Sequence, residues 1–105
     1  MQVKENWSRV TGQVEKWTAP DAPDAPGELL VRVERVADVK DDGGKPWPNL
    51  LEKAAGSSLR VQVPGSTAAS LEVAAGASVT VDVRRGREPG LAFANPERIR
   101  IGKLR

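Results

Sequence analysis

The chain has 105 residues, of which 39% are hydrophobic and 29% are charged, and its formal net charge is +2. This composition predicts one folded domain over residues 1–105, because a chain of this length buries roughly 65% of the surface that its unfolded form exposes. The chain contains no cysteine and no histidine, which excludes disulfides, thiolate metal sites and nucleophiles activated by histidine.

From the sequence we expect neither a membrane span nor a signal peptide in this chain. No apolar run approaches the ~20 residues that cross a bilayer, so we expect no membrane insertion. The first residues, MQVKENWSRV, lack a hydrophobic signal region. This predicts a cytoplasmic protein, or else a periplasmic or secreted mature form whose signal peptide has been removed.

The first predicted element begins at Trp7 and reads WSRVTGQVEKW. Its apolar residues recur at helical spacing, but Gly12 would cost a helix roughly 1 kcal/mol relative to alanine. We therefore predict a strand with a bulge or bend at Gly12. Such a bulge shifts the alternation and places either Trp7 beside Val14 or Trp17 beside Val10, so at least one tryptophan is expected to be buried.

A proline-rich loop and a second strand follow. The loop APDAPDAPG (19–27) has a proline at every third position, which favours extended polyproline geometry. The segment GELLVRVERVADV (27–39) alternates apolar and polar residues until Val36 breaks the pattern. A bulge near Glu34–Arg35 would restore it, and we predict a strand with that bulge.

The segment PNLLEKAAG (48–56) is predicted as a short helix. Asn49 is a suitable N-cap, Glu52 completes a capping box and Gly56 is a typical C-terminal stop. Its buried stripe would consist of Leu50, Leu51 and Ala54.

Four further segments alternate and are rich in β-branched residues, so they are predicted as strands. They are LRVQV (59–63), SLEV (70–73), SVTVDVR (78–84) and RIRI (98–101). The segments RRGREPG (84–90) and FANPE (93–97) are predicted to be the loops between the last strands.

Two of these strands share a leading sequence. AAGSSLRVQV (54–63) and AAGASVTVDV (74–83) match at six of ten positions. We interpret the match as the same local turn occurring twice. In each copy, small residues and a glycine lead the chain into a strand whose valines point inward.

Together these elements predict an all-β fold with one short helix, a closed antiparallel barrel of five to six strands without exposed edges. The long first strand with Gly12, the second strand GELLVRVERV, a helix before LRVQV and a final hairpin at RRGREPG resemble the OB-fold. The resemblance covers most of the chain, is one of topology and carries no family motif, so it implies a fold and only weakly a function. In that family the helix lies between the third and fourth strands, which here requires one early strand to bend into two.

Little in the sequence points to catalysis. Asp38, Asp41 and Asp42 precede two glycines, but their spacing is not that of a calcium loop, and we interpret them as turn residues. Asp21 and Asp24 lie in the proline-rich loop, where no general acid is held near them. We predict a protein that is not an enzyme, with no catalytic residue, no cofactor and no metal.

The charge is distributed unevenly. Residues 1–83 carry nine Lys/Arg against twelve Asp/Glu, a balance of −3, whereas residues 84–105 carry seven against two, a balance of +5. This pattern indicates either an anionic partner or a basic, solvated last strand. The candidate binding residues combine these arginines with the unevenly placed aromatic residues, and they are Trp17, Trp47, Arg84, Arg85, Arg87 and Phe93. Trp47, between two prolines, is expected to be exposed or to lie over the barrel as a lid.

We predict a non-catalytic binding module that contacts a protein partner, because a proline-stiffened loop loses little entropy on docking and a tryptophan near arginines is typical of interface hot spots. One alternative is single-stranded nucleic acid, with aromatic rings stacking on bases and arginines on phosphates. The acidic first loop, with Asp21, Asp24 and Glu28, disfavours it. A small ligand or oligosaccharide on the same face is a second alternative, and the oligomeric state stays open.

Overall fold

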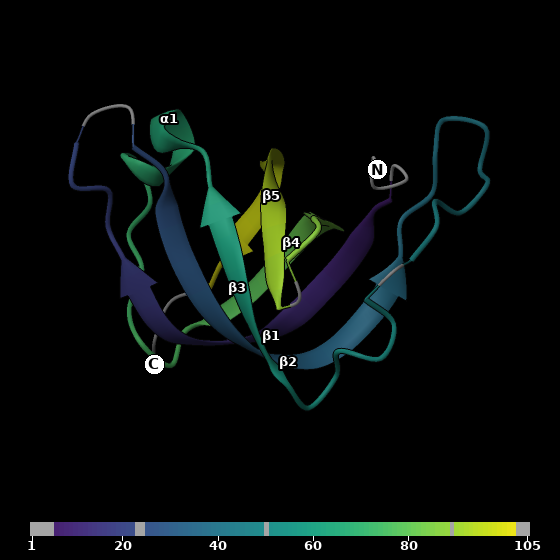
Figure 1. Cartoon of the computed structure of the whole chain (residues 1–105), viewed down its shortest axis with the longest axis horizontal. Helices are drawn as coiled ribbons and strands as arrows, with labels where there is room; N and C mark the ends of the chain where they lie inside the picture. Colours follow the sequence, from purple (N-terminus) through teal and green to yellow (C-terminus); the bar gives the residue numbers. More distant parts are fainter. Residues whose placement is uncertain (1–5, 23–24, 50, 89, 103–105) are drawn as a thin grey trace.

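The computed structural model describes residues 6–22, 25–49, 51–88 and 90–102. Five strands close into a barrel in the order β1-β2-β3-β5-β4, which confirms the predicted all-β barrel with one short helix (Figure 1). The elements are β1 (Ser8–Thr18), β2 (Gly27–Asp38), β3 (Ser58–Val63), α1 (Gly65–Ala68), β4 (Ser78–Arg85) and β5 (Leu91–Ile101).

The strand order and the place of α1 are those of an OB-like barrel. The helix lies between β3 and β4, as in that family, and neither early strand has to be split in two. The barrel closes where β3 and β5 run parallel, with Arg60 opposite Leu91 and Gln62 opposite Phe93. The other neighbouring strands of the described barrel are antiparallel.

The first two strands bend around the barrel at a bulge. Their register shifts at Gly12, which lies opposite Val33, and Glu34 of β2 is left without a partner. This confirms the bulge that the valine pattern predicted near Glu34–Arg35. The backbones are so close here that a Cβ on Gly12 would overlap the carbonyl oxygen of Arg32 and lie 3.0 Å from its carbonyl carbon.

A second shift decides where Trp17 lies. It follows Val14 and leaves Glu15 of β1 without a partner on β2. Because one extra residue reverses the alternation, Trp17 reaches the inner side and packs against the core that contains Val10 and Val14. The predicted strand is confirmed, but the shift that turns Trp17 inward lies at Glu15 rather than at Gly12, and Trp7 and Trp17 are half-buried rather than buried.

Valine is the main residue of the core. The apolar residues that are no more than 1% exposed are Val10, Val14, Leu29, Val31, Val33, Val61, Val63, Val79, Val81, Val83 and Ala92. The cluster also includes Leu51 of the β2–β3 connection, Leu59, Ala94 and Ala68 of α1. Each buried valine or leucine side chain contributes about 1.5–3 kcal/mol through burial.

The helix predicted over 48–56 is wrong. Leu50 lies outside the described residues. Residues 51–56 form successive turns, in which the N–H of Ala54 donates to the carbonyl oxygen of Leu51 at 2.9 Å. Asn49 still acts as a local cap, because its Oδ1 accepts the N–H of Leu51 at 3.2 Å, but it also accepts the hydroxyl of Ser8 at 2.7 Å. The hydrogen bond from Ser8 connects Asn49 to β1, and the segment forms turns instead of a helix.

The two similar ten-residue segments do form the same structure. Gly56 and Gly76 have φ of +88° and +87°, a conformation that favours glycine. Each donates its N–H to the carbonyl of a buried valine, Val33 at 2.8 Å and Val14 at 2.7 Å. In each copy this valine also donates its own N–H to the carbonyl oxygen of the residue after the glycine, which is Ser57 in the first copy and Ala77 in the second. One turn therefore starts both β3 and β4, as the repeat predicted.

Three other segments differ from the prediction. Residues 70–73 are not a strand, although Leu71 and Val73 pack partly against the core and so explain the alternation. The segment 93–97, predicted as a loop, belongs to β5. In the proline-rich loop the N–H of Ala25 donates to Ala22 at 3.1 Å, a turn rather than continuous extended geometry.

No helix in the described part of the chain is long and apolar enough to cross a membrane.

Candidate functional site

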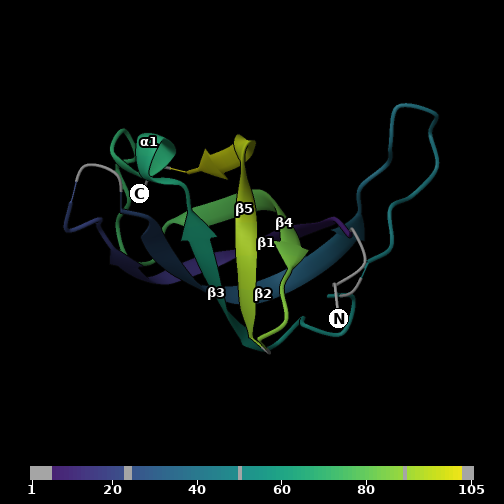
Figure 2. The same cartoon turned by 45° about the horizontal axis from the view of Figure 1, so that its top comes forward.

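The six predicted binding residues lie in three separate places. Trp17 is near the end of β1, whereas Trp47 is in the β2–β3 loop. Figures 1 and 2 show the β1–β2 loop and α1 on one side of the barrel and the β2–β3 loop on the other. The remaining four belong to the β4–β5 hairpin and are Arg84, Arg85, Arg87 and Phe93. The structure therefore does not bring the two tryptophans together with the arginines.

Trp17 helps to close one end of the barrel. A Cβ on Gly27 would overlap its ring and lie 3.1 Å from the Cβ of Ala68, so the indole, the start of β2 and α1 are in tight contact. The ring is half-buried, and it also lines a hollow of about 470 Å³ between the β1–β2 loop and α1. Its packing gives Trp17 a structural role.

Trp47 is half-buried and lies outside the core cluster. Its N–H donates to the carbonyl of Val39 at 2.8 Å, and Lys40 pairs with Pro46, so the loop is itself a small hairpin. Asp41 holds the tip of this hairpin by accepting the N–H groups of Gly43 and Lys45 on Oδ1 at 2.9 and 3.0 Å.

Arg84 and Phe93 form one unit on the outside of the barrel. They are opposite each other on β4 and β5, and the guanidinium carbon of Arg84 lies 5.3 Å from the centre of the phenyl ring. A Cβ on Gly86 would lie 2.7 Å from Cε2 of Phe93, so the ring rests against the glycine backbone. The cation–π contact and the glycine together fix a half-exposed aromatic ring.

The other hairpin arginines are placed differently. The backbone of Arg85 is held by the buried side chain of Asn6, whose Oδ1 accepts its N–H at 2.8 Å and whose Nδ2 donates to its carbonyl at 3.2 Å. Arg87 is exposed in the connection between the strands.

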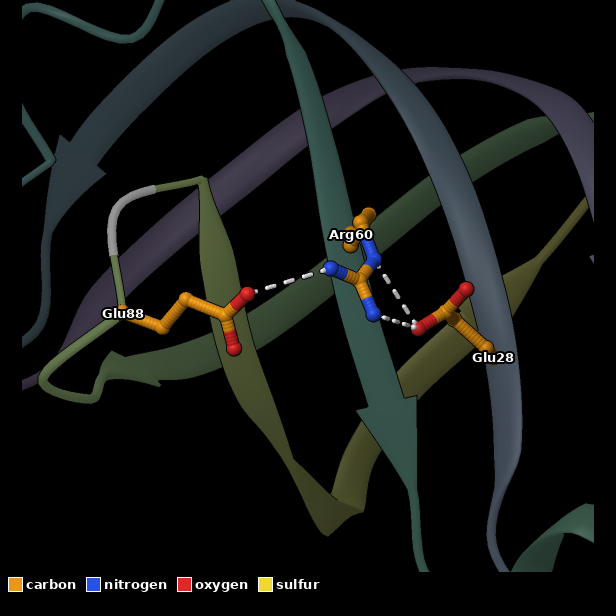
Figure 3. Close-up of polar contacts among 3 residues, drawn as sticks. All are labelled: Glu28, Arg60 and Glu88. Carbon is orange, nitrogen blue, oxygen red and sulfur yellow. Dashed lines mark hydrogen bonds and ion pairs between the residues drawn. The ribbon is translucent and has the colours of Figure 1, made fainter.

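Sequence reasoning missed Arg60, which lies beside the Phe93 unit. Its Nε and Nη2 both donate to Oε1 of Glu28 on β2, at 3.1 and 3.0 Å, and its Nη1 donates to Glu88 of the β4–β5 connection at 3.5 Å (Figure 3). The hydrogen bonds to Glu28, and its charge, raise the pKa of the Arg60 guanidinium. A pattern in one strand does not show this triad, because its members come from three segments.

These residues share one outer surface. Two rows of paired residues run across the strands. In the first row, Arg60 of β3 lies between Leu30 of β2 and Leu91 of β5. The second row follows the order Glu28, Gln62, Phe93 and Arg84. We define the Arg60–Phe93 face as the outward side chains Glu28, Leu30, Arg60, Gln62, Arg84, Glu88 and Phe93. These residues come from β2, β3, β4, β5 and the β4–β5 connection, whose backbones are drawn in Figure 1.

A second polar feature that the sequence did not predict is an ion pair between β1 and β4. Arg9 donates from Nε and Nη2 to the two carboxylate oxygens of Asp82, at 2.8 and 3.2 Å. The hydrogen bond to Asp82, followed by its charge, raises the pKa of Arg9, so the guanidinium stays charged. Among the described residues no group of three or more acidic side chains is placed to hold a metal ion.

No protein-family model, curated protein or solved structure matches this chain. The OB-like assignment therefore stands on strand order and on the position of α1.

Proposed function

We propose that the protein is a non-catalytic binding module whose Arg60–Phe93 face contacts a protein partner. Aromatic residues and arginine are the side chains that most often dominate binding energy at protein interfaces. Phe93 and Arg84 supply both, in an arrangement already fixed by Gly86. A ring that is ordered before binding loses little side-chain entropy in the complex.

The observation that carries the proposal is the charge balance at the centre of this face. Arg60 is held between Glu28 and Glu88, and Arg84 lies over the Phe93 ring. Two positive and two negative side chains therefore surround an apolar ring, and the face as a whole is neutral. A surface of this kind suits a protein partner, which can match both the ring and the charge pattern.

The same triad argues against single-stranded nucleic acid as the ligand. A nucleic-acid groove needs cations free to meet successive phosphates. Here two carboxylates flank the central arginine, and a phosphate backbone crossing β2 and β3 would pass them at close range. Trp17, the other proposed stacking ring, is packed against Gly27 at one end of the barrel.

The test compares matched variants against a purified partner. Proteins cross-linked to the tagged chain in its source cells are identified, and the affinity of each purified candidate is measured by calorimetry. We expect Phe93→Ala to weaken binding by 2 kcal/mol or more, roughly thirtyfold, as for interface hot spots. Arg32→Ala, an exposed change elsewhere on β2, should leave the affinity unchanged.

Nucleic acid is tested in parallel with a fluorescent oligothymidylate at low salt. We expect no binding. If the oligonucleotide binds with a log–log salt slope of about −0.7 for each contacted phosphate, and Arg84→Ala lowers that slope, then the face is a nucleic-acid site and the protein-partner proposal is wrong.

A further inference from the structure

The outer face of β1, β4 and the second half of β5 carries a buried carboxylate. Val81 and Val83 are in the core, so Asp82 between them points out of the barrel, yet it is only 4% exposed. Arg9 covers it with two hydrogen bonds. Because the side chain of Arg9 is itself 46% exposed, the pair fixes one edge of the guanidinium and leaves the rest open to solvent.

β5 brings two more arginines to this face. Its register with β4 is lost beside Asp82, where residues 95–98 form a bulge. Beyond the bulge Ile99 packs against the core. Its neighbours Arg98 and Arg100 therefore lie on the outer side of the strand, where both are exposed.

These arginines line a continuous depression. One hollow of about 320 Å³ is lined by Arg9, Asp82, Arg98 and Arg100, together with Thr80, Glu97 and Ile99. A second, of about 340 Å³, shares Arg9, Asp82 and Arg98 and continues to Asp38, Val39 and Lys40. We refer to the two adjoining hollows as the Arg9 trough.

The trough has unused cationic donors at its centre. Arg9 and Asp82 balance each other, whereas Arg98 and Arg100 form no ion pair within the described residues. Guanidinium groups bind phosphate oxygens with paired, charge-assisted hydrogen bonds. With Asp82 and Glu97 counted, the first hollow carries three guanidinium groups against two carboxylates, a net charge of +1, which attracts a phosphate monoester of charge about −1.5 to −2 at pH 7.

We propose that the Arg9 trough binds a small phosphorylated ligand, whose phosphoryl oxygens accept hydrogen bonds from Arg9, Arg98 and Arg100. This site is separate from the Arg60–Phe93 face and does not depend on the function proposed there. The ligand is small because each hollow also contains a carboxylate besides Asp82, Glu97 in one and Asp38 in the other. A continuous polyanion would meet both of these charges.

The test is a titration of the isotopically labelled protein, followed by ¹H–¹⁵N NMR, with inorganic phosphate and with glycerol 3-phosphate. Sodium chloride and acetate at equal ionic strength are the reference anions. We expect saturable shifts of the Arg9 Nε–H signal and of the amides of Thr80 and Arg100 with the two phosphates only. The double variant Arg98→Gln/Arg100→Gln should weaken binding about tenfold or more, since it removes two charge-assisted contacts.

The matched control is Arg32→Gln/Arg35→Gln, which removes the same charge from exposed positions of β2 and should leave the phosphate affinity unchanged. Equal weakening by the two double variants would show general attraction to a cationic protein and overturn the proposal. So would shifts that follow ionic strength without saturating, or an oligothymidylate that binds the trough more tightly than glycerol 3-phosphate. Phe93→Ala should not alter the phosphate titration, so this proposal and the protein-binding proposal fail separately.

Discussion

Replacement of Gly12 by alanine is the most direct test of how the barrel closes. The new Cβ would overlap the carbonyl oxygen of Arg32 and lie 3.0 Å from its carbon. The obstacle is backbone rather than a movable side chain, so β1 and β2 have to separate. Gly12 lies opposite Val33, and Gln13 lies opposite Arg32, in the ladder that holds these strands together.

The cost follows from two contributions. Overpacking of a filled site costs about 1–3 kcal/mol, and the loss of one or two ladder hydrogen bonds adds about 1 kcal/mol each. Part is recovered because alanine is better than glycine in a strand interior, by about 0.5–1 kcal/mol. We therefore expect Gly12→Ala to lower the free energy of unfolding by about 1–4.5 kcal/mol. The melting temperature should fall by roughly 4–36 °C, at 4–8 °C per kcal/mol.

The assay is urea unfolding, followed by tryptophan fluorescence and by circular dichroism. The control is Gly43→Ala in the β2–β3 loop, where a Cβ would lie 3.4 Å from Oδ1 of Asp41, an ordinary contact. An exposed change of this kind should alter stability by about 0.5 kcal/mol or less. If Gly12→Ala destabilises no more than Gly43→Ala, then the close approach of β1 and β2 at the bulge is not as described and the reasoning fails.

The polar contacts and the loop tryptophan supply three more predictions. Arg9→Met leaves the buried carboxylate of Asp82 without its cation and should cost about 2–4 kcal/mol at pH 7. Urea unfolding measures this loss, and an unchanged midpoint would contradict this account. Asn6→Ala removes both side-chain hydrogen bonds to the backbone of Arg85 and should cost about 1–3 kcal/mol in the same assay; an unchanged midpoint would show that water replaces them. Trp47→Ala should lower stability by about 1 kcal/mol or less, since its ring lies outside the core cluster, and a large fall in melting temperature would make Trp47 structural.

Strand positions were predictable because the alternation of valines is a local property of each strand. The break at Val36 even located the bulge that leaves Glu34 unpaired. The repeated glycine turn was also predictable, since the same local pattern occurs twice and glycine permits the positive φ that Gly56 and Gly76 adopt.

The helix prediction failed because capping signals are local and weak. Asn49 and Gly56 have the residue types of helix ends, but both form hydrogen bonds to strands instead, to Ser8 of β1 and to Val33 of β2. A helix of under two turns cannot compete with such contacts, since its nucleation is costly.

By itself the sequence determined the long alternating strands, the bulge where Gly12 meets β2, the valine-rich core and therefore the small barrel, because each of these depends on residues close together in the chain. It also placed Arg84 near Phe93, since one hairpin carries both. The shifts at Glu15 and at residues 95–98 were not predicted. Only the tertiary structure paired Arg60 with Glu28 and Glu88, and Arg9 with Asp82. These partners lie 28 to 73 positions apart, and their contact depends on which strands become neighbours and in what register, which no pattern within one strand contains.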